Sequence, residues 1–376
     1  MLNERVPFTD LAAMTRDVRA PVEQAWANLL DSSRFVGGEE VEKFERNWAS
    51  YCGVAHGIGV GNGTDALQLT LMALNIGAGD EVIVPANTFV ATAEAVVLAG
   101  ATPVFADVSS DTLLLTPAQL EAAITPRTAA VIVVHLYGQL PDMDALTRSA
   151  SRAGIVLIED AAQAHGARWH GRPAGSMGRA GCFSFYPAKN LGAFGDGGAV
   201  VTADAGLAGR IASLRDHGRS QGSHYDHGLV GTNSRLDGMQ AAVLNAKLPW
   251  LDAWTEARRS IAARYRAALG RGACRPVAEE AGSQGAYHLA VVRIPDRAWV
   301  RRELATAGID TQIHYPVPCH RHGPYRRFAR TPLPIAEKNA GEILSLPMFP
   351  HMSDHQVTRV CDAVTGALDA REPSLR

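Results

Sequence analysis

The chain has 376 residues, of which 47% are hydrophobic and 20% are charged, a size typical of about two domains around a substantial buried core. Its 36 lysines and arginines against 38 aspartates and glutamates give a formal net charge of -2, and the two signs are interspersed. This balance argues against a protein that binds nucleic acid or an anionic membrane, because such proteins present a basic face.

The sequence lacks the patterns of secretion and membrane insertion. Residues 1–9 have no basic segment followed by an apolar run, and no stretch reaches the roughly 18 apolar residues of a membrane span. The five cysteines lie far apart without a Cys-x-x-Cys motif, so we expect no disulfide framework. These features predict a cytoplasmic protein with no membrane partner.

Short runs of β-branched residues alternate with amphipathic helical segments over the first two hundred residues. The predicted strands cover residues 57–60, 81–84, 103–105, 130–134, 155–158, 181–185 and 198–202. The predicted helices between them cover residues 65–74, 91–99 and 143–153. This alternation predicts βαβ units, and therefore an α/β fold with a mostly parallel central sheet covered on both sides.

The pattern changes beyond about residue 235. A long helical stretch over 236–269 is interrupted at Pro249, and we place a domain boundary there, between residues 1–249 and 250–376. The second part has a predicted strand over 287–294 and predicted helices over 297–307, 336–344 and 353–368. In an open α/β sheet the ligand lies beyond the carboxyl ends of the strands, so residues that follow strands are the first candidates for a site.

Asp160 is such a residue, because it follows the apolar run 155–158 directly. A carboxylate at the end of a buried strand is unfavourable unless it meets a cation or hydrogen-bond donors. An isolated aspartate at this position could also cap a helix or belong to an ion pair in the core.

Lys189 is one of only four lysines, and it lies in the glycine-rich segment 184–198 beside apolar residues. Burial there would lower the pKa of the amine and suit it to Schiff-base formation. The alternative is a surface lysine in a flexible loop. The other three, Lys43, Lys247 and Lys338, lie in helix-like sequence, and we expect them to be solvated.

A glycine turn, Gly-Asn-Gly-Thr-Asp at 61–65, leads from a strand into a helix. Exposed amides at a helix N-terminus, together with the hydroxyl of Thr64, can bind a phosphate. The glycines do not fit the G-x-G-x-x-G fingerprint, and the chain has no P-loop pattern. Interpretations as a nicotinamide enzyme or a P-loop protein are therefore disfavoured.

Together, these three segments indicate one cofactor, pyridoxal 5'-phosphate. This cofactor needs a lysine for the Schiff base, a carboxylate for the pyridine nitrogen and a phosphate-binding turn. The carboxylate keeps the nitrogen protonated so that the ring accepts electrons, and the freed lysine amine can then move a proton between carbon atoms.

The same segments resemble those of the DegT-type nucleotide-sugar aminotransferases, which have the aspartate-aminotransferase fold. The resemblance extends from Val-Pro-Phe-Thr-Asp-Leu at 6–11 to His-Tyr-Pro-Val-Pro-Cys-His at 314–320. It implies a three-layer PLP-dependent transferase fold (fold type I) with a smaller C-terminal α+β domain. Residues 231–242 match the family's cross-subunit motif, which implies a homodimer with shared active sites.

By that resemblance, Lys189 forms the Schiff base, Asp160 pairs with the pyridine nitrogen and Gln163 contacts the ring hydroxyl. Phe89, in the segment 87–92, would stack on the face of the ring. The remaining cofactor contacts that the family pattern implies are Gly63, Thr64, Asp65 and Ser184 at the phosphate, with Asn233 reaching the phosphate of the partner subunit.

The family includes a branch in which histidine replaces the lysine and the sugar is dehydrated, so Lys189 implies transamination. The motifs resemble most those of enzymes that act at C3 of a dTDP-3-oxo-6-deoxyhexose, with L-glutamate as the donor in a ping-pong reaction. Such chemistry supplies amino sugars for antibiotics or surface polysaccharides. The alternatives are action at C4, on a UDP-3-keto sugar or on a cyclitol ketone, or a non-catalytic regulator that binds the cofactor.

The substrate needs contacts outside the cofactor site. His165, five residues after Asp160, is a candidate catalytic residue, or equally a buried histidine with a purely structural role. The candidate substrate-binding residues are Tyr186, Arg219, Tyr225, His314, Tyr315 and His320. The alternative for the last three is a rigid turn between domains. His224 and His227 have a spacing seen in metal sites, but no carboxylate or thiol pattern completes one, so we predict no metal.

Overall fold

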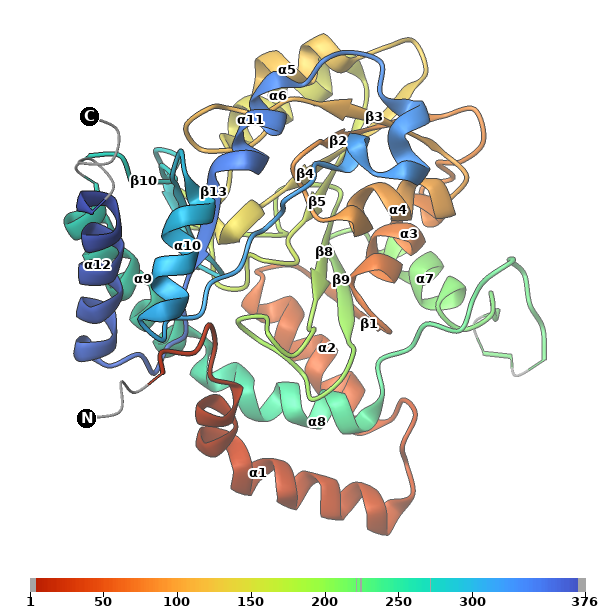
Figure 1. The fold of residues 1–376 in the computed structure, drawn as a ribbon. Coiled ribbons are helices and arrows are strands. Elements are labelled where there is room, and N and C mark those ends of the chain that lie inside the picture. The colour runs from red at the N-terminus through yellow and green to blue at the C-terminus, as the bar shows by residue number, and fades with distance from the viewer. Residues whose placement is uncertain (1–4, 221, 224, 271, 371–376) are drawn as a thin grey trace.

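The computed structural model describes residues 5–370 with the exception of 221, 224 and 271. Its centre is a seven-stranded sheet with the order β1-β9-β8-β5-β4-β2-β3 (Figure 1). The strands are β1 (His56–Val60), β2 (Glu81–Pro85), β3 (Thr102–Ala106), β4 (Thr128–Val134), β5 (Val156–Asp160), β8 (Ala180–Ser184) and β9 (Gly198–Thr202). From β8 to β3 neighbouring strands run parallel, whereas β9 is antiparallel to β1 and β8. The prediction of a mostly parallel sheet is confirmed.

Two layers of helices cover the two faces of this sheet. One layer contains α3 (Gly63–Ala73), α4 (Val90–Leu98) and α7 (Ala205–Leu214); the other contains α2 (Glu39–Tyr51), α5 (Pro117–Ala123), α6 (Met143–Ala153) and α8 (Gly238–Lys247). Successive strand residues face opposite layers, so Val82 and Val84 pack against the first layer and Ile83 against the second. Because both faces are buried, the strands are continuous apolar runs, and this made them visible in the sequence.

The two N-terminal helices, α1 (Leu11–Ser32) and α2, are not among the elements predicted from the sequence. In α1 only a narrow face is buried, and Met14, Val18 and Val22 pack there against Val243 of α8. Figure 1 shows α1 lying along the outside of α8. A helix with so few buried residues has a weak periodic pattern.

Short elements connect these layers. A small sheet contains β6 (Arg168–Trp169), β7 (Arg172–Pro173) and β11 (Ser283–Gln284). The 3-10 turns are η1 (Leu136–Gly138), η2 (Leu248–Trp250), η3 (Cys319–Arg321) and η4 (Gly323–Phe328). The second of these contains Pro249 and separates α8 from the next helix, as the sequence predicts.

The C-terminal part forms a further apolar cluster at one side of the central sheet (Figure 1). Three antiparallel strands lie there, β10 (Arg275–Pro276), β12 (Ala290–Arg293) and β13 (Ile343–Leu346). The helices beside them are α9 (Leu251–Leu269), α10 (Arg297–Thr306) and α12 (Asp354–Asp369). This mixture of strands and helices confirms the predicted α+β character of the region.

Two predicted boundaries in this part are corrected by the structure. The helix predicted over 336–344 is α11 (Pro334–Glu342), and it ends early because Ile343 begins β13 and pairs with Arg293. The strand predicted over 287–294 is shorter and corresponds to β12. In both cases pairing between strands that are distant in the sequence decides where the element begins or ends.

The domain boundary near residue 249 stays a prediction. The apolar contacts cross it in both directions, because Val6 packs in the C-terminal cluster, where its backbone bridges to Ile309. Cys319 and Tyr325 pack instead in the cluster that covers one face of the central sheet. The first residues of the chain therefore help to build the second apolar cluster.

Two general properties of the chain are visible in the described residues. All five cysteines are buried and free, so none is joined in a disulfide. Within the described ranges, no helix combines the length and the apolar character required to cross a membrane.

Glu81, the first residue of β2, has an unusually rich set of partners. Its buried side chain accepts hydrogen bonds from Arg127 Nε at 3.0 Å and from Arg330 Nη2 at 2.7 Å. These partners lower the pKa of Glu81 from 4.5 to about 2. A carboxyl group whose pKa is lower in the folded state than in the unfolded state stabilises the fold at pH values above its unfolded-state pKa. This stabilisation is lost as the pH falls through the folded-state pKa.

We therefore expect Glu81→Gln to lower the free energy of unfolding by about 1–3 kcal/mol near neutral pH. The difference from the wild type should shrink as the pH falls from 4.5 towards 2. Urea unfolding followed by circular dichroism at a series of pH values measures both effects.

Glu23→Gln is the matched control, because Glu23 pairs with Arg19 on an exposed surface of α1. Loss of this exposed ion pair should lower the free energy of unfolding by at most about 0.5 kcal/mol. Equal unfolding midpoints for the two variants would contradict the role given to Glu81.

Candidate active site

A cavity of about 860 Å³ lies at the carboxyl ends of the parallel strands. Asp160 ends β5, Ser184 ends β8, and the N-terminus of α3 lies beside them. Eleven of the residues singled out in the sequence line this cavity: Gly63, Thr64, Asp65, Phe89, Asp160, Gln163, Ser184, Tyr186, Lys189, His314 and Tyr315. The structure therefore brings together side chains that are up to 252 residues apart in the chain (Gly63 to Tyr315, 315 − 63).

The carboxylate of Asp160 is buried at the floor of the cavity. Thr92 Oγ1 donates a hydrogen bond to Oδ2 at 2.8 Å, and the amide of Ala162 donates to Oδ1 at 3.2 Å. Burial raises the pKa of Asp160 above its usual range, while these two donors act in the opposite direction. Within the described part of the chain, no arginine, lysine or histidine forms an ion pair with it. The carboxylate is therefore not part of an ion pair in the core, and it can meet the cation of a ligand.

Lys189 lines the same cavity, and its backbone is held in place. Its amide donates to the carbonyl of Tyr186 at 2.8 Å, and the next residue, Asn190, donates through Nδ2 to Ala286 O at 2.8 Å. Burial lowers the pKa of Lys189 to about 8, and the negative charge of Asp160 partly opposes this shift. These contacts exclude the alternative of a surface lysine in a flexible loop.

The expectation that Lys247 is solvated was wrong. Its side chain is buried, with Nζ 2.7 Å from the carbonyl of Gly192 and 4.6 Å from the centre of the Phe194 ring. Burial lowers the pKa of Lys247 to about 8. The helical pattern around Lys247 did not show which face of α8 meets the loop after Lys189, so its position was decided by tertiary packing.

The turn before α3 has the geometry of an anion site. Asn62 caps the helix by accepting a hydrogen bond from the amide of Asp65 at 2.9 Å. A Cβ atom at Gly63 would lie 2.7 Å from Ser184 Cβ, so only glycine allows the helix end and β8 to approach this closely. The amides at this end and the hydroxyls of Thr64 and Ser184 lie at the cavity, where the helix dipole favours a negative charge.

Asp65 has two local hydrogen-bond partners, and its predicted contact with the phosphate stays a prediction. Its Oδ2 atom accepts hydrogen bonds from Ser234 Oγ at 2.6 Å and from Asn62 Nδ2 at 3.0 Å. Asp65 therefore ties the beginning of α3 to the segment before α8, and in this way supports the anion site.

A network of polar and aromatic side chains forms the opposite wall. Gln163 accepts from the amide of Tyr137 at 2.6 Å and donates to Tyr315 Oη at 3.1 Å. The rings of Tyr315 and Phe89 lie 5.2 Å apart. Burial lowers the pKa of His314 to about 4, so this imidazole is neutral near neutral pH. The segment after residue 313 thus reaches the cavity, and contact of His314 and Tyr315 with a substrate stays a prediction.

Two histidines singled out in the sequence do not line the cavity. His165 is buried among aromatic rings, with Phe183 and Phe185 each 5.6 Å away, and burial lowers its pKa to about 3. His320 is buried as well, and its Nε2 lies 2.9 Å from Glu337 Oε1. For His165 the structure matches the alternative of a buried histidine, and His320 contacts Glu337 of α11 and does not line the cavity.

Three more predicted residues lie on an arm formed by the described residues of 216–233 (all but 221 and 224), which projects beside α7 (Figure 1). Arg219 pairs with Asp216 at 3.0 Å, the side chain of Tyr225 is 95% exposed, and Asn233 is exposed. None of the three lines the cavity of its own chain. His224 lies outside the described residues, and Nδ1 of His227 is 2.9 Å from the carbonyl of His217.

Several residues that line the cavity are not among those predicted from the sequence, for example Thr92, His288 and Gln312. Thr92 is the last residue of the segment 87–92, in which Phe89 was predicted to contact the cofactor. Because α4 begins at Val90, Thr92 lies one helical turn after Thr88. That spacing was the signal that could have been used. For the other two, no local pattern marks a residue that reaches the site from the C-terminal part.

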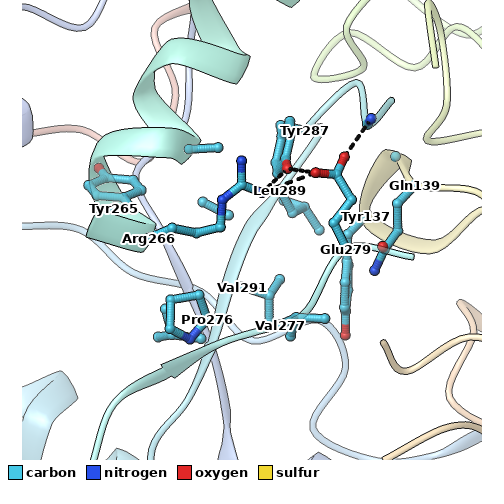
Figure 2. Close-up of a pocket in the computed structure, with 15 residues that line it drawn as sticks. Tyr137, Gln139, Tyr265, Arg266, Pro276, Val277, Glu279, Tyr287, Leu289 and Val291 are labelled. Carbon is cyan, nitrogen blue, oxygen red and sulfur yellow. Dashed lines mark hydrogen bonds and ion pairs between the residues drawn. The ribbon is translucent and has the colours of Figure 1, made fainter. Parts of the chain in front are cut away.

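A second cavity, of about 50 Å³, lies between α9 and β12 (Figure 2). Figure 2 shows its polar groups directed at one another: Glu279 accepts from Tyr287 Oη at 2.7 Å, and Arg266 Nη1 lies 3.2 Å from Glu279. The remaining labelled walls are largely apolar side chains. Its volume has room for only a few water molecules, so we do not consider it an active site.

The groups in the large cavity fit pyridoxal phosphate. They comprise a lysine amine with a lowered pKa, a buried carboxylate without an ion-pair partner, and a glycine-lined helix end suited to phosphate. The fold and this cavity define the class: an α/β protein in which a lysine amine and a buried carboxylate line one cavity at the carboxyl ends of a parallel sheet.

The chain belongs to the DegT/DnrJ/EryC1/StrS aminotransferase family, whose model matches residues 17–365, and it is therefore an aminotransferase. It is 49% identical to the dTDP-3-amino-3,4,6-trideoxy-alpha-D-glucose transaminase of Streptomyces venezuelae, over 96% of this chain and 95% of the relative. It is 44% identical to the dTDP-3-amino-3,6-dideoxy-alpha-D-galactopyranose transaminase of Aneurinibacillus thermoaerophilus, over 96% of this chain and 98% of the relative.

A solved structure agrees with the fold. The crystal structure of S. venezuelae DesV in complex with a ketimine intermediate superposes with a TM-score of 0.94 at 48% identity, covering 96% of this chain and 98% of that chain. The predicted transferase fold of type I is confirmed.

The position of Asp160 relative to Lys189 makes a prediction about the cofactor-free protein. Because the charge of Asp160 raises the pKa of the amine, Asp160→Asn should lower the pKa of Lys189 below its value of about 8. With only four lysines in the chain, carbon NMR of reductively methylated protein can follow each amine, and Lys189→Arg assigns the signal.

Asp65→Asn is the matched control, since Asp65 lines the same cavity and its own partners are Ser234 and Asn62. It should leave the pKa of Lys189 unchanged. A rise of that pKa in Asp160→Asn would contradict the proposed arrangement of charges.

Proposed function

We propose that the chain transfers an amino group from L-glutamate to the C3 keto group of a dTDP-3-oxo-6-deoxyhexose, with pyridoxal 5'-phosphate as cofactor. The product would be a dTDP-3-amino-3,6-dideoxyhexose. The observation that carries this proposal is that Lys189, Asp160 and the N-terminus of α3 line one cavity. The substrate assignment is supported by the names of two relatives, which are both 3-amino sugar transaminases.

When bound, pyridoxal phosphate supplies an electron sink that makes a hydrogen on the amine-bearing carbon acidic. The ionised carboxylate of Asp160 would hold the proton on the ring nitrogen. Lys189 Nζ, with a pKa of about 8, can both accept and release a proton near neutral pH, so this amine is suited to moving the proton between carbon atoms.

Other residues of the cavity would bind and orient. Thr64, Ser184 and the amides of the α3 N-terminus would bind the phosphate, because they present donors at the positive end of a helix dipole. Gln163 would contact the ring hydroxyl, and Phe89 would pack on the ring. Tyr186 and His314 would contact the sugar.

We also propose a homodimer in which two copies complete each site. Lys189 is the only lysine or arginine among the described residues that line the cavity, yet a sugar nucleotide carries a diphosphate that needs cations. The described residues of the arm that carries Arg219, Tyr225 and Asn233 do not line the cavity of their own chain; Tyr225 and Asn233 are exposed, and Arg219 is half-buried beside Asp216. An arm of the second copy would supply them.

Lys189→Ala should abolish the visible absorbance of the cofactor-loaded protein and reduce turnover by at least 10³-fold, because both depend on the amine. Lys43→Ala, at an exposed lysine on α2, should leave both unchanged. Absorbance spectroscopy and a coupled assay for 2-oxoglutarate make the comparison. Residual turnover close to wild type in Lys189→Ala would disprove the role of the amine.

The substrate is tested by incubating purified protein and L-glutamate with dTDP- and UDP-linked sugars that carry a ketone at C3 or at C4. We expect the largest gain of an amine, measured by mass spectrometry and located by NMR, with the dTDP-linked C3 ketone. A preference for a C4 ketone or for UDP would replace the substrate in this proposal. If no sugar is aminated while the cofactor is bound, the sugar substrate of this proposal is wrong, and a cyclitol ketone or a regulatory role takes its place.

A further inference from the structure

Two threonine hydroxyl groups form a hydrogen-bonded row that ends at the carboxylate of Asp160. The proposed reaction gives these hydroxyl groups no role. Thr92 Oγ1 donates to Asp160 Oδ2 at 2.8 Å, and Thr88 Oγ1 lies 2.9 Å from Thr92 Oγ1. Both threonines are almost completely buried, at 2% and 1% exposure for Thr88 and Thr92. An ionised carboxylate can only accept, so Thr92 must donate to it and must in turn accept from Thr88.

This direction matters because it favours one charge state. Two donors reach the Asp160 carboxylate, the Thr92 hydroxyl and the Ala162 amide, and donors to a carboxylate stabilise its ionised form. Burial acts against that form. The titratable groups around Asp160 are Lys189, His135, Glu159, Cys182 and Tyr315, and none of them is hydrogen-bonded to its carboxylate.

The backbone places the two hydroxyls with little freedom. Thr88 precedes α4 and Thr92 lies in its first turn, so the two side chains are one helical turn apart. The carbonyl of Thr88 accepts a hydrogen bond from Cys319 Sγ at 3.2 Å, and the amide of Cys319 donates to Ala86 O at 2.7 Å. The segment that carries the threonines is thus attached to the C-terminal part of the chain.

A buried threonine in a helix more often bonds the carbonyl four residues earlier, and Thr70 of α3 does so. Its Oγ1 atom donates to Ala66 O at 2.7 Å, and the side chain is fully buried. The equivalent acceptor for Thr92 is the Thr88 carbonyl, but the Thr92 hydroxyl donates to Asp160 instead. Thr92 therefore has a contact that helix structure alone does not explain.

We propose that Thr92, supported by Thr88, is a positioning residue that keeps Asp160 ionised and oriented for the ring nitrogen of the cofactor. This inference rests on the proposed use of pyridoxal phosphate. Thr92 acts through Asp160, so its removal should change how the apoprotein binds the cofactor, whether or not a sugar is present.

Thr92→Val removes the hydroxyl and keeps the shape of the side chain. We expect the apoprotein of this variant to bind pyridoxal phosphate about tenfold more weakly or worse, since a hydrogen bond to a charged group is lost. Thr92→Ser should restore binding to within about threefold of wild type, and Thr88→Val should have a smaller effect in the same direction. Fluorescence titration of the apoprotein measures each affinity.

Infrared spectroscopy of the cofactor-free protein gives a second readout. Thr92→Val should show a larger protonated-carboxyl band than wild type at the same pH, and this increase should be absent from the double variant with Asp160→Asn. The signal depends only on the ionisation of Asp160, so it separates the proposed role from a general loss of activity.

Thr70→Val is the matched control, because it removes a buried threonine hydroxyl from the neighbouring helix. It should lower the unfolding midpoint without weakening cofactor binding. The inference is overturned if Thr92→Val binds the cofactor like wild type, or if Thr70→Val weakens binding equally. If the wild-type apoprotein itself fails to bind pyridoxal phosphate, the proposed function fails first, and this inference falls with it.

Discussion

The structure depends on one unfavourable arrangement, a buried carboxylate without an ion-pair partner at the end of β5. Removing a charge from water costs several kcal/mol unless other groups compensate. Here the Thr92 hydroxyl, the Ala162 amide and the nearby amine of Lys189 compensate in part. Because these groups compensate only part of the desolvation cost, the Asp160 carboxylate is suited to bind a ligand that carries a positive charge.

The central sheet creates the place where this can happen. β5 lies between β4 and β8, both parallel to it, so its carboxyl end is flanked by the ends of its neighbours. Because helices cover both faces of the sheet, polar side chains can gather at the carboxyl ends of these strands. The close approach of Gly63 to Ser184 then brings the positive end of α3 to the same edge.

The rest of the cavity is built from segments far along the chain. Arg258 of α9 is fully buried and donates through Nη1 to the carbonyl of Met348 at 3.1 Å and to that of Tyr287 at 3.3 Å. Met348 lines the cavity, and so does His288, the residue that follows Tyr287. Buried polar contacts of this kind hold the wall near the lysine, and Lys247 does the same for the loop after Lys189.

By itself, the sequence determined the strands of the central sheet, the lysine, the aspartate and the glycine turn, because apolar runs and glycine spacing are local patterns. It did not determine that Lys247 is buried, that His165 and His320 do not line the cavity, or that Thr92 bonds Asp160. Those facts depend on which faces of distant elements meet. Only the packing of the complete chain decides this, since a residue's neighbours in space are not encoded by its neighbours in sequence.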